Sequence, residues 1–143
     1  MASGIEITDG LVTTLEGVAL ITGGVYRGTA ARAVNEDHPM PFVAVNATTE
    51  SSTFNRAGIL QMDRSYSIEM VFEDKNTPST LEVDMENTRR AVLKALTEWI
   101  NASKRVFQPD VTFNVTIGLP DTGSDFAVLK IDLSLTYPEN FLN

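Results

Sequence analysis

The feature that most constrains this fold is an alternating strand followed, within ten residues, by a long amphipathic helix. In "YSIEMVFE", residues 66–73, apolar and polar side chains alternate with the period of two that a half-buried strand requires. The residues on its apolar face are Tyr66, Ile68, Met70 and Phe72. Because an apolar sheet face must be covered, this pattern predicts a sheet with a helix packed against it.

The helix is predicted to begin at Thr77-Pro78, since threonine suits the N-cap and proline the first helical position. Ser79 and Glu82 offer a capping box as an alternative start. The apolar stripe of this helix consists of Leu81, Met85, Thr88, Val92, Ala95, Leu96 and Trp99. The opposite face carries Glu82, Glu86, Arg89, Arg90 and Lys94. One face therefore packs on the sheet and the other contacts water.

A second, shorter helix is predicted near the N-terminus, in "IEITDGLVTTLEGVAL", residues 5–20. Its apolar residues recur at helical spacing and are Ile7, Leu11, Leu15 and Val18. Thr8 or Asp9 is the expected N-cap. Gly10 and Gly17 weaken this helix, each by about 1 kcal/mol relative to alanine, and the threonines leave a strand as the alternative.

Further strands are expected in "VYRGTAARAV" (25–34), at Phe42–Val45, in "VTFNVTIGL" (111–119) and in "FAVLKIDLSLTY" (126–137). The last two form an antiparallel hairpin joined by "PDTGSD". The polar stretch 51–58 reads as a projecting loop or hairpin arm. We predict one α+β domain over residues 1–143: a mainly antiparallel, mixed β-sheet backed by two α-helices, with a projecting polar hairpin arm.

Charge and composition exclude several classes of function. The formal charge is −8, from 11 Lys and Arg against 19 Asp and Glu, which disfavours a groove that holds nucleic acid. The absence of cysteine excludes thiolate catalysis, disulfides and cysteine-bearing zinc sites. No apolar run approaches the ~20 residues of a membrane helix, and "MASGIEITDG" lacks the features of a signal peptide. We expect a soluble protein made in the cytoplasm.

No motif in the chain predicts catalysis, a cofactor or a bound metal. His38 is the only histidine and lies in a proline-rich loop, without a nucleophile-elbow serine to serve. "LPDTG" (119–123) matches a sortase anchoring pattern but lacks the apolar span that must follow it, so a hairpin turn is expected. Four carboxylates could accept Mg²⁺, but their spacing matches no metal-binding loop, and solvated charge is expected: Glu73, Asp74, Asp84 and Glu86.

The order of these features resembles the tail terminator (tail completion) proteins of long-tailed bacteriophages, of the lambda type. The resemblance covers nearly the whole chain, from the N-terminal helix through "VYRGTAARAV", a loop reaching "HPMPFVAV", and the polar hairpin. It continues through "SYSIEMVF", the capped helix and the final strand "FAVLKIDLSLTY". Its local signatures are the proline-bracketed strand and the alternating strand that the long helix follows.

The resemblance implies a structural protein of the virion rather than an enzyme. A hexameric ring of this protein would cap the tail tube, stop its polymerisation and offer an attachment surface to the head connector. The implied partners are further copies of the chain, the tail tube protein and head-tail connector proteins. DNA would pass through the ring without specific binding, and neither a membrane nor a cofactor is involved. The protein would be made in the host cytoplasm and reside at the head-proximal end of the tail.

Two alternatives stay open. One is a head-tail connector or neck subunit, and the other, from a different class, is a small α+β ligand-binding domain or enzyme. Two segments are candidates for subunit or partner contacts. In the polar arm the candidates are Phe54, Arg56, Ile59 and Leu60, and the alternative is an ordinary hairpin loop. After the last strand they are Tyr137, Phe141 and Leu142, and the alternative is packing against the chain's own core.

Overall fold

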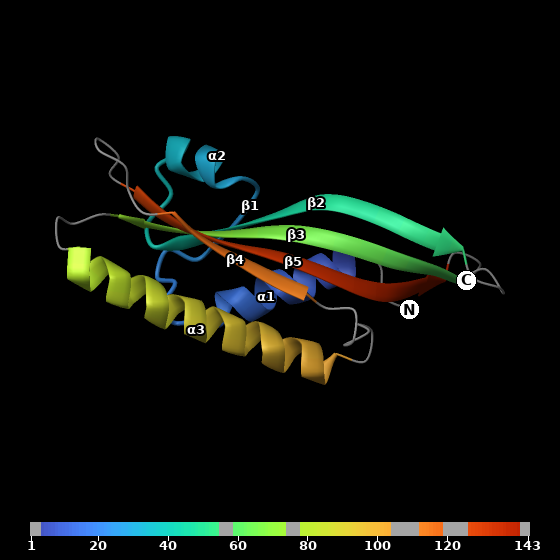
Figure 1. The fold of residues 1–143 in the computed structure, drawn as a ribbon. Coiled ribbons are helices and arrows are strands. Elements are labelled where there is room, and N and C mark those ends of the chain that lie inside the picture. Colours follow the sequence, from blue (N-terminus) through green and yellow to red (C-terminus); the bar gives the residue numbers. More distant parts are fainter. Residues whose placement is uncertain (1–3, 55–58, 74–77, 104–111, 119–125, 141–143) are drawn as a thin grey trace.

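The computed structural model describes residues 4–54, 59–73, 78–103, 112–118 and 126–140. Five strands form one sheet in the order β1-β2-β3-β5-β4 (Figure 1). The strands are β1 (Val25–Arg27), β2 (Phe42–Phe54), β3 (Ile59–Glu73), β4 (Thr112–Gly118) and β5 (Phe126–Asn140). The helices are α1 (Gly4–Glu16), α2 (Ala30–Asn35) and α3 (Pro78–Ala102). Only β1 and β2 pair in parallel, so the predicted α+β fold with a mixed, mainly antiparallel sheet is confirmed.

The helices lie on both faces of the sheet, with α1 and α3 on one face and α2 on the other (Figure 1). We call the face toward α1 and α3 the inner face and the opposite one the outer face. The alternation in β3 is confirmed, because the inner face buries Tyr66, Ile68, Met70 and Phe72 in the main core. Val71 faces the other way and packs in a second, smaller core under α2. Both faces of β3 are thus apolar where a helix covers them.

The long helix α3 begins at Pro78, as its sequence predicts, while Thr77 lies outside the described residues. The buried residues of its stripe are Leu81, Met85, Thr88, Val92, Leu96 and Ile100, and Ala95 and Trp99 pack beside them partly buried. Thr88 is tolerated in this apolar row because its hydroxyl donates a hydrogen bond of 2.7 Å to the backbone carbonyl of Asp84. The predicted packing face is confirmed.

The prediction of a strand over residues 25–34 is wrong in its second half. The chain forms β1 and then turns into α2, a third helix that the sequence analysis did not predict. Thr29 caps it, since its hydroxyl accepts a hydrogen bond from the backbone N–H of Arg32 at 3.3 Å. Ala30 and Ala33 are small enough for α2 to approach Phe42 on the outer face, and this contact decides the local structure.

The N-terminal segment is a helix, as predicted, but α1 already includes Gly4, so neither Thr8 nor Asp9 is its cap. The Thr8 hydroxyl instead donates to the carbonyl of Gly4 at 2.9 Å and lies 2.8 Å from the hydroxyl of Tyr66 on β3. Gly10 lies where α1 meets α3, because a Cβ there would be 3.1 Å from Nε1 of Trp99. This glycine therefore lets the two helices approach closely, in exchange for lower helix propensity.

The described part of the polar stretch predicted to project, residues 51–54, belongs to a strand. β2 continues to Phe54, with a register irregularity between Ala47 and Thr49, and β3 resumes at Ile59. We call the paired segments 49–54 and 59–65 the arm. β5 runs beside the arm on its other side as far as the pair Ile59–Asn140, so the sheet is still three strands wide here. The arm is therefore an extension of the sheet rather than an isolated hairpin.

Candidate functional site

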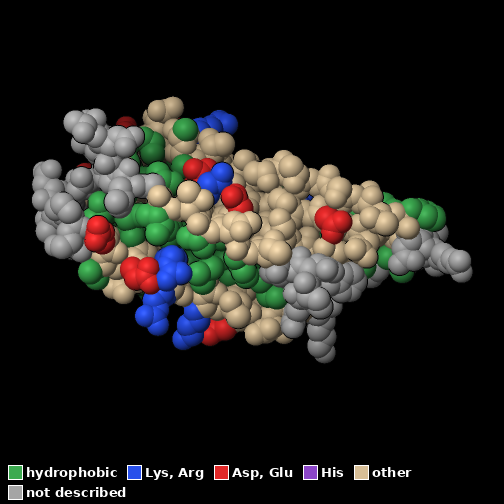
Figure 2. All heavy atoms as spheres, viewed as in Figure 1, with side chains coloured by type: hydrophobic (Ala, Val, Ile, Leu, Met, Phe, Trp, Pro, Cys, Tyr) green, Lys and Arg blue, Asp and Glu red, His purple; other side chains and the backbone are tan. Residues whose placement is uncertain are grey.

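The end of the arm exposes a large aromatic side chain. Phe54 is 78% exposed, and its register partner Leu60 is partly buried against the main core. Ile59, the next candidate, is partly buried. Hydrophobic side chains are visible at this end of the molecule in Figure 2. Arg56, the other candidate predicted here, lies outside the described residues. An exposed phenylalanine at the end of a rigid projection is suited to contact another protein.

Polar and aromatic contacts hold the inner face of the arm in place. Arg64 pairs with Glu50 at 3.5 Å and lies over the ring of Tyr66, 5.4 Å from its centroid.

Burial raises the pKa of Tyr66, and burial likewise raises the pKa of Tyr137. The folded state thus binds these phenolic protons more tightly than the unfolded chain, and the resulting stabilisation is lost as the pH rises above about 10.

The C-terminal candidates divide between the described and undescribed parts of the chain. Tyr137 has no exposed surface and packs in the main core, opposite Met62 in the strand register. This is the self-packing alternative, so Tyr137 is removed from the candidate contact residues. Phe141 and Leu142 lie outside the described residues.

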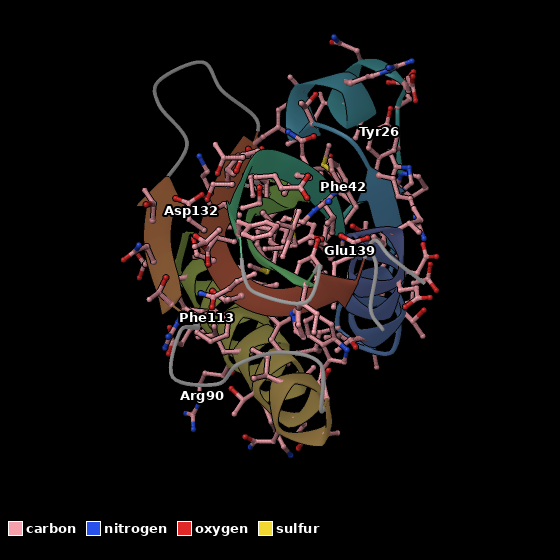
Figure 3. All side chains as sticks on the ribbon, turned by 90° about the vertical axis from the view of Figure 1, so that its right-hand side faces the viewer. Tyr26, Phe42, Arg90, Phe113, Asp132 and Glu139 are labelled. Carbon is pink, nitrogen blue, oxygen red and sulfur yellow. The ribbon has the colours of Figure 1, made fainter. Side chains whose placement is uncertain are left out.

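A second apolar surface lies along β4, at the edge of the sheet. The predicted strand carries Phe113, Val115 and Ile117 on one face, and their partners on β5 are buried core residues. Only Phe113 packs against the core, on the side of the sheet that faces α3 (Figure 3). Val115 is 39% exposed and Ile117 60% exposed, so the described residues leave this face of the edge strand partly uncovered.

Between β4 and α3 runs a groove of about 320 Å³, where hydrophobic side chains reach the surface (Figure 2). Its lining consists of Glu82, Met85, Glu86, Arg89, Ile117 and Leu129. Met85 and Leu129 are buried residues of the core, so the groove has an apolar floor and a charged rim on α3. Periodicity alone could not reveal this groove, because it depends on where α3 crosses the sheet.

The charged rim of the groove is an ordered ion pair. Arg89 donates two hydrogen bonds to Glu86, of which the bond from Nε to Oε2 measures 2.9 Å. This bidentate contact lowers the pKa of the Glu86 carboxyl below its ordinary value.

Replacing Arg89 with methionine should raise the pKa of Glu86 towards its ordinary value, because the charge-assisted hydrogen bonds are lost. A carboxyl titration followed by NMR measures this directly. Lys94→Met provides the control, since it removes a cation from the same helix but no recorded partner of Glu86. An unchanged pKa in Arg89→Met would contradict the pairing.

A separate hollow of about 400 Å³ lies near the first half of α3. Its lining consists of Leu20, Thr22, Met40, Pro41, Phe72, Glu73, Leu81, Asp84, Asn87 and Thr88. Among the residues that the structure describes, this lining contains two carboxylates and neither an imidazole nor an ammonium group. The described residues contain no group of three His, Cys, Asp or Glu side chains placed to hold a metal ion.

His38 does not take part in this hollow. Its Nε2 lies 2.8 Å from the carbonyl oxygen of Gly23, and its ring meets those of Tyr26 and Phe42 edge-on, with centroids 5.5 and 5.1 Å away. These contacts join the loop before β2 to β1, so the geometry of His38 is that of a structural residue.

Among the helices that the structure describes, none combines the length and apolar character needed to cross a membrane. No protein-family model matches the chain, and no curated protein matches its sequence.

Proposed function

We propose that the protein is a ring-forming subunit of a long phage tail, which caps the tail tube, ends its polymerisation and presents a surface to the head connector. The proposal starts from the resemblance of its element order to tail terminator proteins. The order found in the structure is consistent with it: a helix, a short strand, the proline-bracketed β2, the arm, β3, the long α3 and the final hairpin strand β5.

One observation carries the proposal: exposed apolar side chains are present on strands at two separate margins of the sheet. Phe54 lies at the end of the arm, and Val115 and Ile117 lie on the far edge strand. Two different contact surfaces on one subunit are what a head-to-tail ring requires, because each subunit then contacts its two neighbours differently. A helix-backed sheet supplies the fixed geometry that closes such a ring.

The charge of the chain is compatible with a ring through which DNA passes. At a formal charge of −8, the protein has a net repulsion for phosphates, so DNA in the lumen would not be held by counterion release.

The proposal is tested by adding the protein to polymerising tail tube protein from the same genome. We expect tubes that stop growing and carry a ring at one end in electron micrographs. Tube lengths that do not change would overturn the capping function. Binding to a portal or adaptor protein instead of tubes would favour the head-tail connector, which is the second candidate because the same surfaces serve either partner.

Within that assay, Phe54→Ser should reduce capping roughly tenfold, since exposed aromatic anchors commonly contribute this much to an interface. The melting temperature should stay close to that of the wild type, because the side chain is mostly exposed. Val83→Ser removes a 57% exposed apolar side chain from α3 and should leave capping unchanged. Equal losses in both variants would show that the effect is not specific to the arm.

A further inference from the structure

The outer edge of β4 lacks the features that usually prevent a sheet edge from pairing. In the part of the chain that the structure describes, β4 pairs only with β5, so no described residue pairs with the backbone N–H and C=O groups on its other side. Its sequence, "TFNVTIG", contains no charged residue and no proline. Natural edge strands are commonly protected by lysine, proline or a bulge. An unprotected edge beside an apolar groove is a surface suited to strand addition.

The opposite side of the sheet has a second free edge. β1 pairs with β2 only as far as Val45, the register partner of Arg27. The last contact on this side is the hydrogen bond of 2.9 Å that the N–H of Gly28 donates to the carbonyl of Val45. From Asn46 to Phe54, no described residue pairs with β2 on that side. The single charge in this stretch is Glu50, which already pairs with Arg64.

The two free edges are complementary in direction. β2 is antiparallel to β3, β3 to β5 and β5 to β4, so β2 and β4 run in opposite directions. β4 lies level with residues 42–49 of β2, part of which β1 covers, so a second copy must be displaced along the strand direction. Two copies side by side in the same orientation, displaced in this way, would bring β4 of one copy antiparallel to the arm segment of β2 of the next. The lengths also correspond, since β4 has 7 residues and β2 extends over 13, of which β1 covers three.

The side chains at these edges match in face as well. Ser52 and Phe54 pair with Met62 and Leu60, which contact the main core, so the arm presents them on the inner face. Val115 and Ile117 belong to the same face of β4, beside the groove. In a sheet continuing across two copies, the aromatic ring of Phe54 would cover apolar surface along β4 that is otherwise exposed.

We propose that the free edge of β4 binds the outer edge of the β2 arm of a second copy, antiparallel, with Phe54 packed beside β4 at the β4–α3 groove. A second copy is favoured over an unrelated peptide because one chain carries both edges, with matching direction and face. The contact is heterologous, so it repeats from copy to copy. This inference depends on the proposed function in one respect: in the ring, this contact would be the one between neighbouring subunits.

Disulfide trapping tests this contact, and the chain has no native cysteine to interfere. Single cysteines are placed in the arm, as Ser52→Cys or Phe54→Cys, and on β4, as Val115→Cys or Ile117→Cys. Arm and β4 variants are mixed under mild oxidation, with an affinity tag on one partner to separate mixed dimers from identical pairs by mass. Trapping accumulates covalent dimers even when the free association is weak.

The face control is Asn114→Cys, which is on the same strand but points to the outer face, because side chains alternate along a strand. For at least one arm cysteine, we expect the yield of mixed dimers with Val115→Cys or Ile117→Cys to be about tenfold higher than the yield with Asn114→Cys. The reason is that only cysteines on the same face of the joined sheet come close enough, in the right orientation, to form a disulfide. No enrichment over the Asn114 control would overturn the proposal. Dominant dimers between two β4 cysteines would overturn it in favour of a symmetric β4–β4 contact.

A second measurement uses substitutions that keep the fold. The cysteine pair here is Phe54→Cys in the arm of one partner and Val115→Cys on β4 of the other. Adding Ile117→Lys to the partner that carries Val115→Cys should reduce the yield of mixed dimers about tenfold, because lysine protects an edge strand. The matched control is Ile5→Lys on α1, where the isoleucine is 62% exposed against 60% for Ile117. Equal trapping in both variants would overturn the proposal. Specific trapping in a protein that fails to cap tubes would preserve this contact and overturn only the capping function.

Discussion

Replacing Gly23 with alanine should destabilise the protein by more than about 4 kcal/mol, a loss seen only for exceptional single substitutions. A Cβ at this position would lie 1.9 Å from the carbonyl oxygen of Pro39 and 2.7 Å from that of Pro41. Both contacts are to backbone, so no side-chain rotation relieves them. The N–H of Gly23 also donates to the carbonyl of Pro41 at 2.7 Å, which holds the two segments together. Urea denaturation followed by circular dichroism measures the loss.

Two other glycines provide graded controls for this prediction. At Gly24 a Cβ would meet nothing within 4 Å, but the φ angle of +78° makes alanine strained by about 1–2 kcal/mol. At Gly17 the nearest contact is the carbonyl oxygen of Thr14 at 3.4 Å, an ordinary van der Waals distance. The loss of stability should therefore be largest at Gly23, smaller at Gly24 and smallest at Gly17. Equal losses at Gly23 and Gly24 would refute the clash.

Leu96→Ala should cost about 2–5 kcal/mol in the free energy of unfolding, the range for truncating a buried leucine. Leu96 has no exposed surface and lies in the α3 stripe that packs in the main core. Truncation leaves a cavity between the helix and the sheet, because the strands beneath it are held by pairing on both sides. Thermal denaturation of the variant should show a correspondingly lower midpoint.

The control is Val83→Ala on the same helix. Val83 is 57% exposed, so its truncation should change stability by no more than about 0.5 kcal/mol. A loss as large as that of Leu96→Ala would mean that Val83 is covered in solution by another copy of the chain. The dependence of the midpoint on protein concentration would then identify that contact.

The elements that the sequence predicts well are those with strong periodicity. The alternation in 66–73 correctly identifies the inner face of β3, and the stripe from Leu81 to Trp99 correctly identifies the packed face of α3. Both follow from local geometry, since a strand repeats every two residues and a helix every 3.6. The mixed, mainly antiparallel sheet backed by helices follows from the order of these elements.

The missed elements depend on contacts between segments. The alanine-rich stretch after β1 becomes α2 because its small residues fit over Phe42, which the local pattern does not reveal. The polar segment does form the paired strands of the predicted hairpin arm. Only its widening into an extension of the sheet, with β5 running beside it, was not evident from the sequence. Of the arm candidates, Phe54 is the one with a largely exposed side chain in the described residues, whereas Tyr137 at the other predicted surface is buried.

By itself, the sequence determined which side chains share a face, because the periods of helix and strand follow from backbone geometry. The tertiary structure decided which of those faces are covered. Val115 and Ile117 have the same alternation as the buried residues of β3, yet they are exposed because α3 crosses the sheet beside other strands. Gly10 is a weak helix residue in isolation, and its missing side chain matters only because Trp99 packs against it.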